Sequence, residues 1–122
     1  MRIELVSAGP DGGPNWIEVR DKIKGGDIFA VHEASEIPIG EDGRTTSVSY
    51  QGLDDAQFAA LAQRVITAWS FQVPLPPSVA AAKSVIGDLE EDDFWKLNGA
   101  LRPMLDKIKA GGPAAPKTPP DN

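Results

Sequence analysis

Apolar and polar residues alternate in two short stretches near the start of this chain. In Arg2–Ser7, the side chains of Ile3 and Leu5 fall on one face of an extended backbone. Residues 9–14 are a cluster of glycine, proline and aspartate, and alternation resumes in Asn15–Arg20. Two extended stretches on either side of turn-forming residues predict an antiparallel β hairpin.

Two later stretches carry apolar residues at the spacing of an amphipathic helix. The first helix is predicted over about Asp55–Ser70, with Asp54 as its N-cap. The second begins near Leu89, has Asp88 as a candidate N-cap, and contains Pro103, which predicts a kink or a break. The apolar stripes are Phe58, Leu61, Ala62, Val65, Ile66 and Trp69 in the first helix, and Phe94, Leu97, Leu101, Met104, Leu105 and Ile108 in the second.

The remaining segments are shorter or lack a clear period. Asp27 is a candidate cap for a short helix over Ile28–Glu33, and the alanine-rich Ser78–Lys83 favours a helical turn or two. Glu36–Gln51 combines proline, glycine and a threonine- and serine-rich run, and is either a second hairpin or an exposed loop. Gly111–Asn122 holds four prolines and no bulky apolar residue, which predicts a disordered tail.

Together these elements predict an α+β domain over residues 1–110, followed by the disordered tail at 111–122. The N-terminal hairpin should pack with the two main amphipathic helices, and 122 residues suit one domain. The net charge of −6 argues against binding to nucleic acid or to an anionic membrane, because no run of Lys or Arg offers a local basic patch. The sequence shows no signal peptide and no membrane-spanning stretch, so we expect a cytoplasmic protein.

Few residues suit catalysis or metal binding. The absence of cysteine excludes disulfides, thiolate chemistry and cysteine zinc sites. His32 is the single histidine, and its place beside Val31 in a short helix is more typical of a packed or exposed residue than of a catalytic one. Asp88 and Glu90–Asp93 form an acidic run without the spacing of a calcium loop; such acids stabilise a helix N-terminus, or offer an acidic surface to a basic partner. We predict no enzymatic activity, no cofactor and no metal.

Two groups of aromatic and aliphatic residues are the better candidates for function. An extended, proline-rich segment after the first helix either lines the core or forms the wall of a groove for an apolar segment of another protein. Trp95 lies beside the stripe of the second helix, and either packs on a neighbouring element or contacts a partner. The predicted partner-binding residues are Trp69, Phe71, Val73, Leu75 and Trp95.

The order of these features resembles a family of small proteins encoded near the tail genes of long-tailed bacteriophages, the tail assembly chaperones. The resemblance covers most of Met1–Ile108 and consists of patterns of apolar residues and prolines. It is carried by Trp16–Arg20 followed by Asp21, by Val65–Phe71 at the end of a helix, by the proline-rich Val73–Pro76, by the acidic link Ile86–Leu89, and by Ala100–Met104.

The resemblance implies a non-enzymatic helper that acts in the host cytoplasm. Such a chaperone binds the long, aggregation-prone tape measure protein until tail tube subunits polymerise around it. These chaperones often have a longer form made by a translational frameshift, for which the C-terminal tail would be the junction. Two alternatives remain open: a structural virion protein, such as a head–tail connector, neck or tail-completion subunit, and a regulator that binds a host protein.

Overall fold

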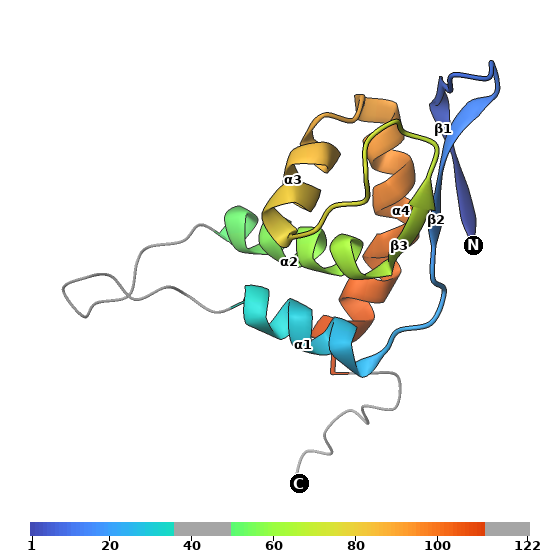
Figure 1. The fold of residues 1–122 in the computed structure, drawn as a ribbon. Coiled ribbons are helices and arrows are strands. Elements are labelled where there is room, and N and C mark those ends of the chain that lie inside the picture. Colours follow the sequence, from blue (N-terminus) through green and yellow to red (C-terminus); the bar gives the residue numbers. More distant parts are fainter. Residues whose placement is uncertain (36–49, 112–122) are drawn as a thin grey trace, which may run out of the picture.

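The computed structural model describes residues 1–35 and 50–111, and this part of the chain has an α+β fold (Figure 1). It contains a three-stranded antiparallel sheet with the strand order β1-β2-β3, together with four helices. The predicted fold class is confirmed. In chain order the elements are β1 (Arg2–Ala8), β2 (Pro14–Val19), α1 (Gly25–Ala34), α2 (Tyr50–Val65), β3 (Ile66–Trp69), α3 (Val79–Gly87) and α4 (Glu91–Lys109). The predictions for residues 36–49 and for the tail beyond Gly111 lie outside the described residues.

The predicted N-terminal hairpin is present. Strands β1 and β2 pair antiparallel, with Ile3 opposite Ile17, and both side chains are buried. The turn between the strands closes through a hydrogen bond from the Gly9 amide to the Gly13 carbonyl oxygen. Gly12 has a φ angle of 90°, a left-handed conformation that glycine adopts without a Cβ clash.

The first main helix is shorter at its C-terminal end than the sequence predicts. The prediction ran from Asp55 to Ser70, whereas α2 ends at Val65 and the chain continues as strand β3. This strand pairs antiparallel with β2 and places Trp69 opposite Ile17. The helical stripe that reaches Trp69 in the sequence is therefore interrupted, because the backbone of β2 offers hydrogen bonds to the β-branched start of β3.

The predicted N-caps of the two main helices are wrong. Asp54 lies inside α2, where its carboxylate pairs with Arg102 of α4 at 3.0 Å. Asp88 is the C-cap of α3, and α4 begins after Glu90, whose side chain makes no capping hydrogen bond. These aspartates have the residue type of a cap, but residue type alone does not fix where a helix begins.

The short helices also differ from their predictions. Helix α1 begins at Gly25, so Asp27 is its third residue and not its cap; its carboxylate accepts the Lys24 amide at 2.8 Å. Helix α3 is longer than a turn or two, and its N-cap Ser78 accepts the Ala81 amide at 3.1 Å. Helix α4 continues through Pro103 without the break that the sequence left open.

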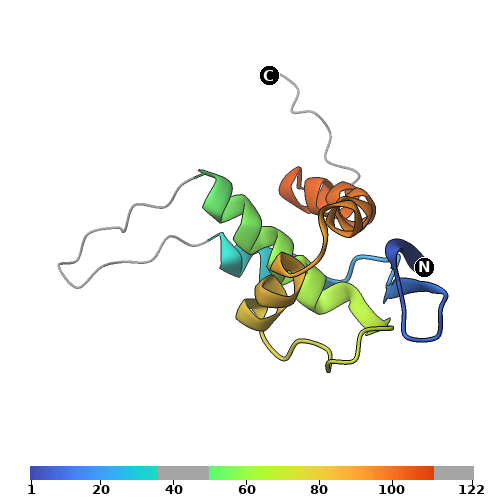
Figure 2. The ribbon, with the colours of Figure 1, turned by 90° about the horizontal axis from the view of Figure 1, so that it is seen from above.

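The helices pack around α2, which contacts α1, α3 and α4. Helix α4 lies next to the sheet and contacts β1, and Figure 2 shows α2 running between α4 and α3. Phe58 of α2 and Phe94 of α4 meet in this interior, with ring centroids 6.1 Å apart. The buried core consists of Ile3, Leu5, Ile17, Val19, Val31, Phe58, Leu61, Ala62, Val65, Ile66, Ile86, Leu97, Leu101, Leu105 and Ile108.

Candidate functional site

The aromatic half of the predicted binding segment faces the interior. Trp69 and Phe71 are half-buried and pack against the hydrophobic core. Their rings meet edge to face with centroids 5.4 Å apart, and the Trp69 indole N–H donates to the Val73 carbonyl oxygen at 2.8 Å. These contacts fix the start of the segment that joins β3 to α3, and they leave little of either ring to meet a partner.

The aliphatic half of the same segment faces outward. Val73 is 49% exposed and Leu75 is 40% exposed. Pro76, which follows Leu75, is buried, and its carbonyl oxygen accepts a hydrogen bond from the Gln63 side chain of α2 at 3.4 Å. The segment is thus held against α2 while its two aliphatic side chains remain free to contact another molecule.

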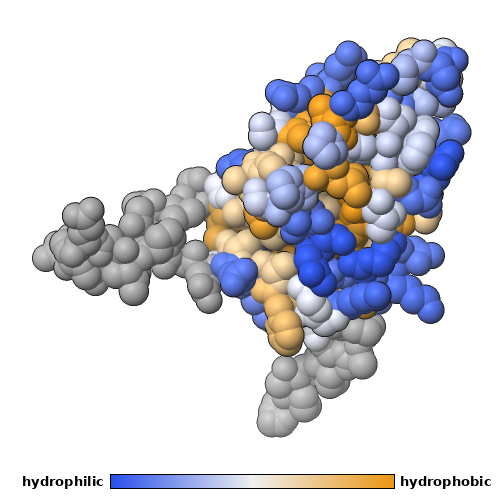
Figure 3. All heavy atoms as spheres, viewed as in Figure 1, coloured by the Kyte–Doolittle hydropathy of each residue, from blue (hydrophilic) through white to orange (hydrophobic). Residues whose placement is uncertain are grey.

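Residues from α1 and α3 extend this apolar surface. Phe29 of α1 is 74% exposed, and with Val79 of α3 it borders a hollow of about 500 Å³ that is also lined by Ala30 and Gln63. On the face drawn in Figure 3, apolar residues gather over α1, over α3 and over the segment that leads into α3. We call this surface the α1–α3 face; its exposed apolar side chains are Phe29, Val73, Leu75 and Val79.

The sequence prediction missed Phe29, although a signal for its exposure was present. Ile28 and Val31 are three residues apart and share one side of α1, whose Val31 is fully buried. Phe29 is one residue on from Ile28, which turns it about 100° away from that side. An aromatic residue off the apolar stripe of a short helix is a candidate surface contact.

Trp95 does not join the other predicted residues. Trp95 is 57% exposed and borders a separate hollow of about 360 Å³ between α2, α3 and α4. The indole stacks edge to face on Phe94 with centroids 5.1 Å apart, and its N–H lies 3.4 Å from a carboxylate oxygen of Glu91. Four of the five predicted residues therefore lie on one segment, and Trp95 belongs to another surface.

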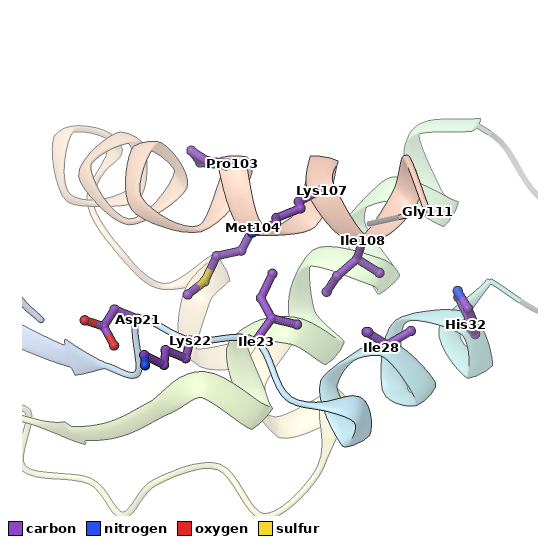
Figure 4. Close-up of a pocket in the computed structure, with 10 residues that line it drawn as sticks. All are labelled: Asp21, Lys22, Ile23, Ile28, His32, Pro103, Met104, Lys107, Ile108 and Gly111. Carbon is purple, nitrogen blue, oxygen red and sulfur yellow. The ribbon is translucent and has the colours of Figure 1, made fainter. Parts of the chain in front are cut away.

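His32 lies apart from the one acidic residue with which it shares a groove. His32 is exposed on α1 and lines a groove between α1 and α4, in which Asp21 is the one acidic lining residue. Figure 4 shows His32 and Asp21 at opposite ends of this groove. No group of three or more metal-ligating His, Asp or Glu side chains occurs among residues 1–35 and 50–111.

A buried ion cluster holds α1 against the sheet and α2. Asp27 is fully buried and accepts from Arg20 at 2.8 and 3.0 Å and from Arg64 at 3.1 Å. Burial acts to raise the pKa of Asp27, but hydrogen bonds from Arg20, the Lys24 amide and Arg64 outweigh it and hold the pKa below its ordinary value. The sequence analysis missed this cluster, because nothing in the spacing of the three residues brings them together.

Asp54 links α2 to the C-terminal half of α4. The Arg102 guanidinium donates to both carboxylate oxygens at 3.0 and 3.3 Å, and Lys109 approaches at 3.2 Å. Hydrogen bonding from Arg102 is the largest influence on the pKa of Asp54; with Lys109 it outweighs burial and holds that pKa below its ordinary value. This contact and the Asp27 cluster are structural, since both satisfy their charges within the fold.

Comparison with protein-family models, curated proteins and solved structures finds no match. The family resemblance noted from the sequence therefore stays a prediction. Within the described residues, no helix has the length and apolar character needed to cross a membrane. The α1–α3 face is the candidate functional site on the strength of its geometry, and the chemistry it offers is apolar contact.

Proposed function

We propose that this protein is a bacteriophage tail assembly chaperone that binds apolar segments of the tape measure protein through the α1–α3 face. The observation that carries the proposal is the exposure of Phe29, Val73, Leu75 and Val79 on neighbouring elements. Exposed apolar groups cost solubility, and a protein retains such a surface when a partner covers it. A client rich in amphipathic helices offers the apolar stripes that would do so.

The charge of the protein supports the same role. The chain carries a net charge of −6, and a strongly charged chaperone keeps its complex with an apolar client in solution. Glu33 and Gln63 border the hollow beside Phe29, so the apolar centre of the face has a polar rim. A polar rim around an apolar centre is typical of protein-binding surfaces and supports the proposal.

A co-expression experiment tests the proposal. Where the encoding DNA carries a gene for a long coiled-coil-like protein downstream, that protein is produced alone, with the wild type, and with a Phe29→Ser/Val79→Ser variant, and its soluble fraction is measured after ultracentrifugation. We expect the wild type to keep the client soluble and the double variant to lose most of this effect. Val6→Ser is the matched control, because Val6 is 61% exposed on β1, outside the α1–α3 face.

The outcome also separates the proposal from its main alternative. Retention of client solubility by the Phe29→Ser/Val79→Ser variant would show that another surface binds. If the wild type has no effect on the client and the protein is instead found in purified virions, the function is that of a structural virion protein. A slippery sequence near the codons for Lys109–Lys117, joining an overlapping frame, would support the chaperone.

A further inference from the structure

The groove between α1 and α4 has an apolar floor and a basic rim. Its volume is about 670 Å³, and it is lined by the segment before α1, by α1 itself and by the C-terminal half of α4. Figure 4 shows the side chains of Ile23, Ile28, Met104 and Ile108 turned toward one another across the groove. Such a space suits one large apolar side chain and part of the segment that carries it.

Two lysines at this groove make no ion pair within the described residues. Among residues 1–35 and 50–111, Lys22 and Lys107 share this property with Lys24, Lys83 and Lys96, whereas Lys109, Arg102, Arg64 and Arg20 pair with aspartates. His32 also borders the groove, and Asp21 is the one acid that lines it. In a protein with a net charge of −6, two unpaired lysines beside an apolar floor select an occupant that is both apolar and acidic.

The N-terminal end of α4 carries exposed side chains that are apolar and acidic. Trp95 is 57% exposed, and Glu91 and Asp92 precede it by four and three residues, so both acids share its side of the helix. The Glu91 carboxylate lies 3.4 Å from the indole nitrogen. An indole with acidic residues one turn before it matches the groove in size and in charge: the ring can occupy the apolar floor while the acids face Lys22 and Lys107.

One copy of the chain cannot make this contact with itself. Trp95 and Lys107 lie on the same helix, and at roughly 1.5 Å per residue they are about 18 Å apart along its axis. We infer that the protein self-associates head to tail, with Trp95, Glu91 and Asp92 of one copy in the α1–α4 groove of the next. A contact between two different patches is heterologous, so it extends to a ring or a short chain of copies. This inference is independent of the proposed client, which occupies the α1–α3 face.

Complementation between two variants tests the direction of the contact. Trp95→Ala removes the inserting side chain, and Lys22→Glu/Lys107→Glu reverses the charge of the groove. Sedimentation velocity of the wild type at increasing concentration, up to on the order of 100 μM, should show association that weakens several-fold when NaCl is raised from about 0.05 to 0.5 M. Each variant alone should associate at least roughly tenfold more weakly.

The decisive sample is the mixture. The groove variant keeps its Trp95 patch, and the Trp95→Ala variant keeps its groove, so the two together should form a 1:1 dimer and nothing larger. Val6→Ser is the matched control, because Val6 is exposed on β1 and lines neither the groove nor the hollow beside Trp95, and it should associate like the wild type. Thermal melting checks that the variants are folded, and Lys107→Gln provides a milder change that should weaken association in the same direction.

Three results would overturn the inference. They are a wild type that stays monomeric at the highest concentration, variants that associate as tightly as the wild type, and a mixture in which both variants remain monomers. The last result would show that the Trp95 patch of one copy does not bind the α1–α4 groove of another.

Discussion

The carboxylate of Asp93, at the start of α4, accepts three hydrogen bonds from β1, two of them from Ser7. The Ser7 hydroxyl donates at 2.5 Å and the Ser7 amide at 3.1 Å, and the Val6 amide completes the set at 2.7 Å. Only 3% of Asp93 is exposed. One aspartate therefore joins the first turn of the last helix to the first strand, two segments at opposite ends of the described chain.

Replacing Asp93 by alanine should lower the free energy of unfolding by about 2 kcal/mol, because two strand amides and a hydroxyl lose their acceptor. Asp93→Asn keeps one acceptor oxygen and should cost roughly half as much. Urea unfolding at neutral pH measures both changes. Asp92→Ala is the control: Asp92 is exposed in the same turn, so the loss should stay within about 0.5 kcal/mol. Equal losses for Asp92→Ala and Asp93→Ala would mean that the contact with β1 contributes nothing.

Removing the Asp27 carboxylate should lower the free energy of unfolding more than removing that of Asp93. Asp27→Ala leaves the guanidinium groups of Arg20 and Arg64 without their shared acceptor, and we expect a loss of about 3 kcal/mol. Both arginines are partly exposed, so water recovers some of this cost. Glu33→Ala, at an exposed position on the same helix, should change stability by less than about 0.5 kcal/mol. Thermal or urea unfolding of the two variants gives the comparison, and a loss under about 1 kcal/mol for Asp27→Ala would contradict the expectation.

Acid should destabilise the fold through three aspartates. Burial acts to raise the pKa of Asp93, but hydrogen bonds from Ser7 and Val6 outweigh it, so that this pKa, like the pKa values of Asp27 and Asp54, lies below its ordinary value. A carboxyl group whose pKa is lower in the folded state stabilises the fold above its unfolded pKa, about 3.9. That contribution is lost as the pH falls through the folded value.

The free energy of unfolding should therefore change little between about pH 7 and pH 5 and should fall below about pH 4. Urea unfolding at a series of pH values measures the curve. Asp93→Asn should show a smaller acid-dependent loss than the wild type, because one of the three linked groups no longer titrates. A wild-type stability that is unchanged or higher at about pH 3 would show that relief of the net negative charge outweighs these hydrogen bonds.

Local sequence patterns predicted the helices and strands better than they predicted which of these elements pair or pack together. Alternation placed Ile3 and Leu5 on the buried face of a strand, and helical spacing placed Leu97 and Leu101 in the core, because each pattern needs only neighbouring residues. Strand β3 was missed since its pairing with β2 joins segments about fifty residues apart. Residues after Val65 continue the apolar stripe of α2, so periodicity alone gave no reason to end the helix there.

The candidate sites were predictable to different degrees. The exposure of Val73 and Leu75 could not be separated from the partial burial of Trp69 and Phe71, because alternation places all four side chains on one side of an extended backbone. The partners of Asp93 could not be predicted, because in the sequence it is one of several adjacent acids and only the position of β1 distinguishes it. The α1–α4 groove was likewise invisible, since it depends on how two helices far apart in sequence meet.

Gly99 offers a test of the helix that carries both patches of the proposed self-association. It lies in the interior of α4, is exposed, and a methyl group built on it meets no atom within 4 Å outside the adjacent residues and the nearby helix backbone. Glycine in a helix interior costs about 1 kcal/mol relative to alanine, mainly because it has more freedom in the unfolded chain. Gly99→Ala should therefore raise the free energy of unfolding by about 1 kcal/mol in urea titrations. Gly111→Ala is the opposite control, because its φ of 89° strains any residue with a Cβ, and it should not stabilise. Destabilisation by Gly99→Ala would mean that α4 does not continue as a regular helix across the turn that joins Gly99 to Pro103.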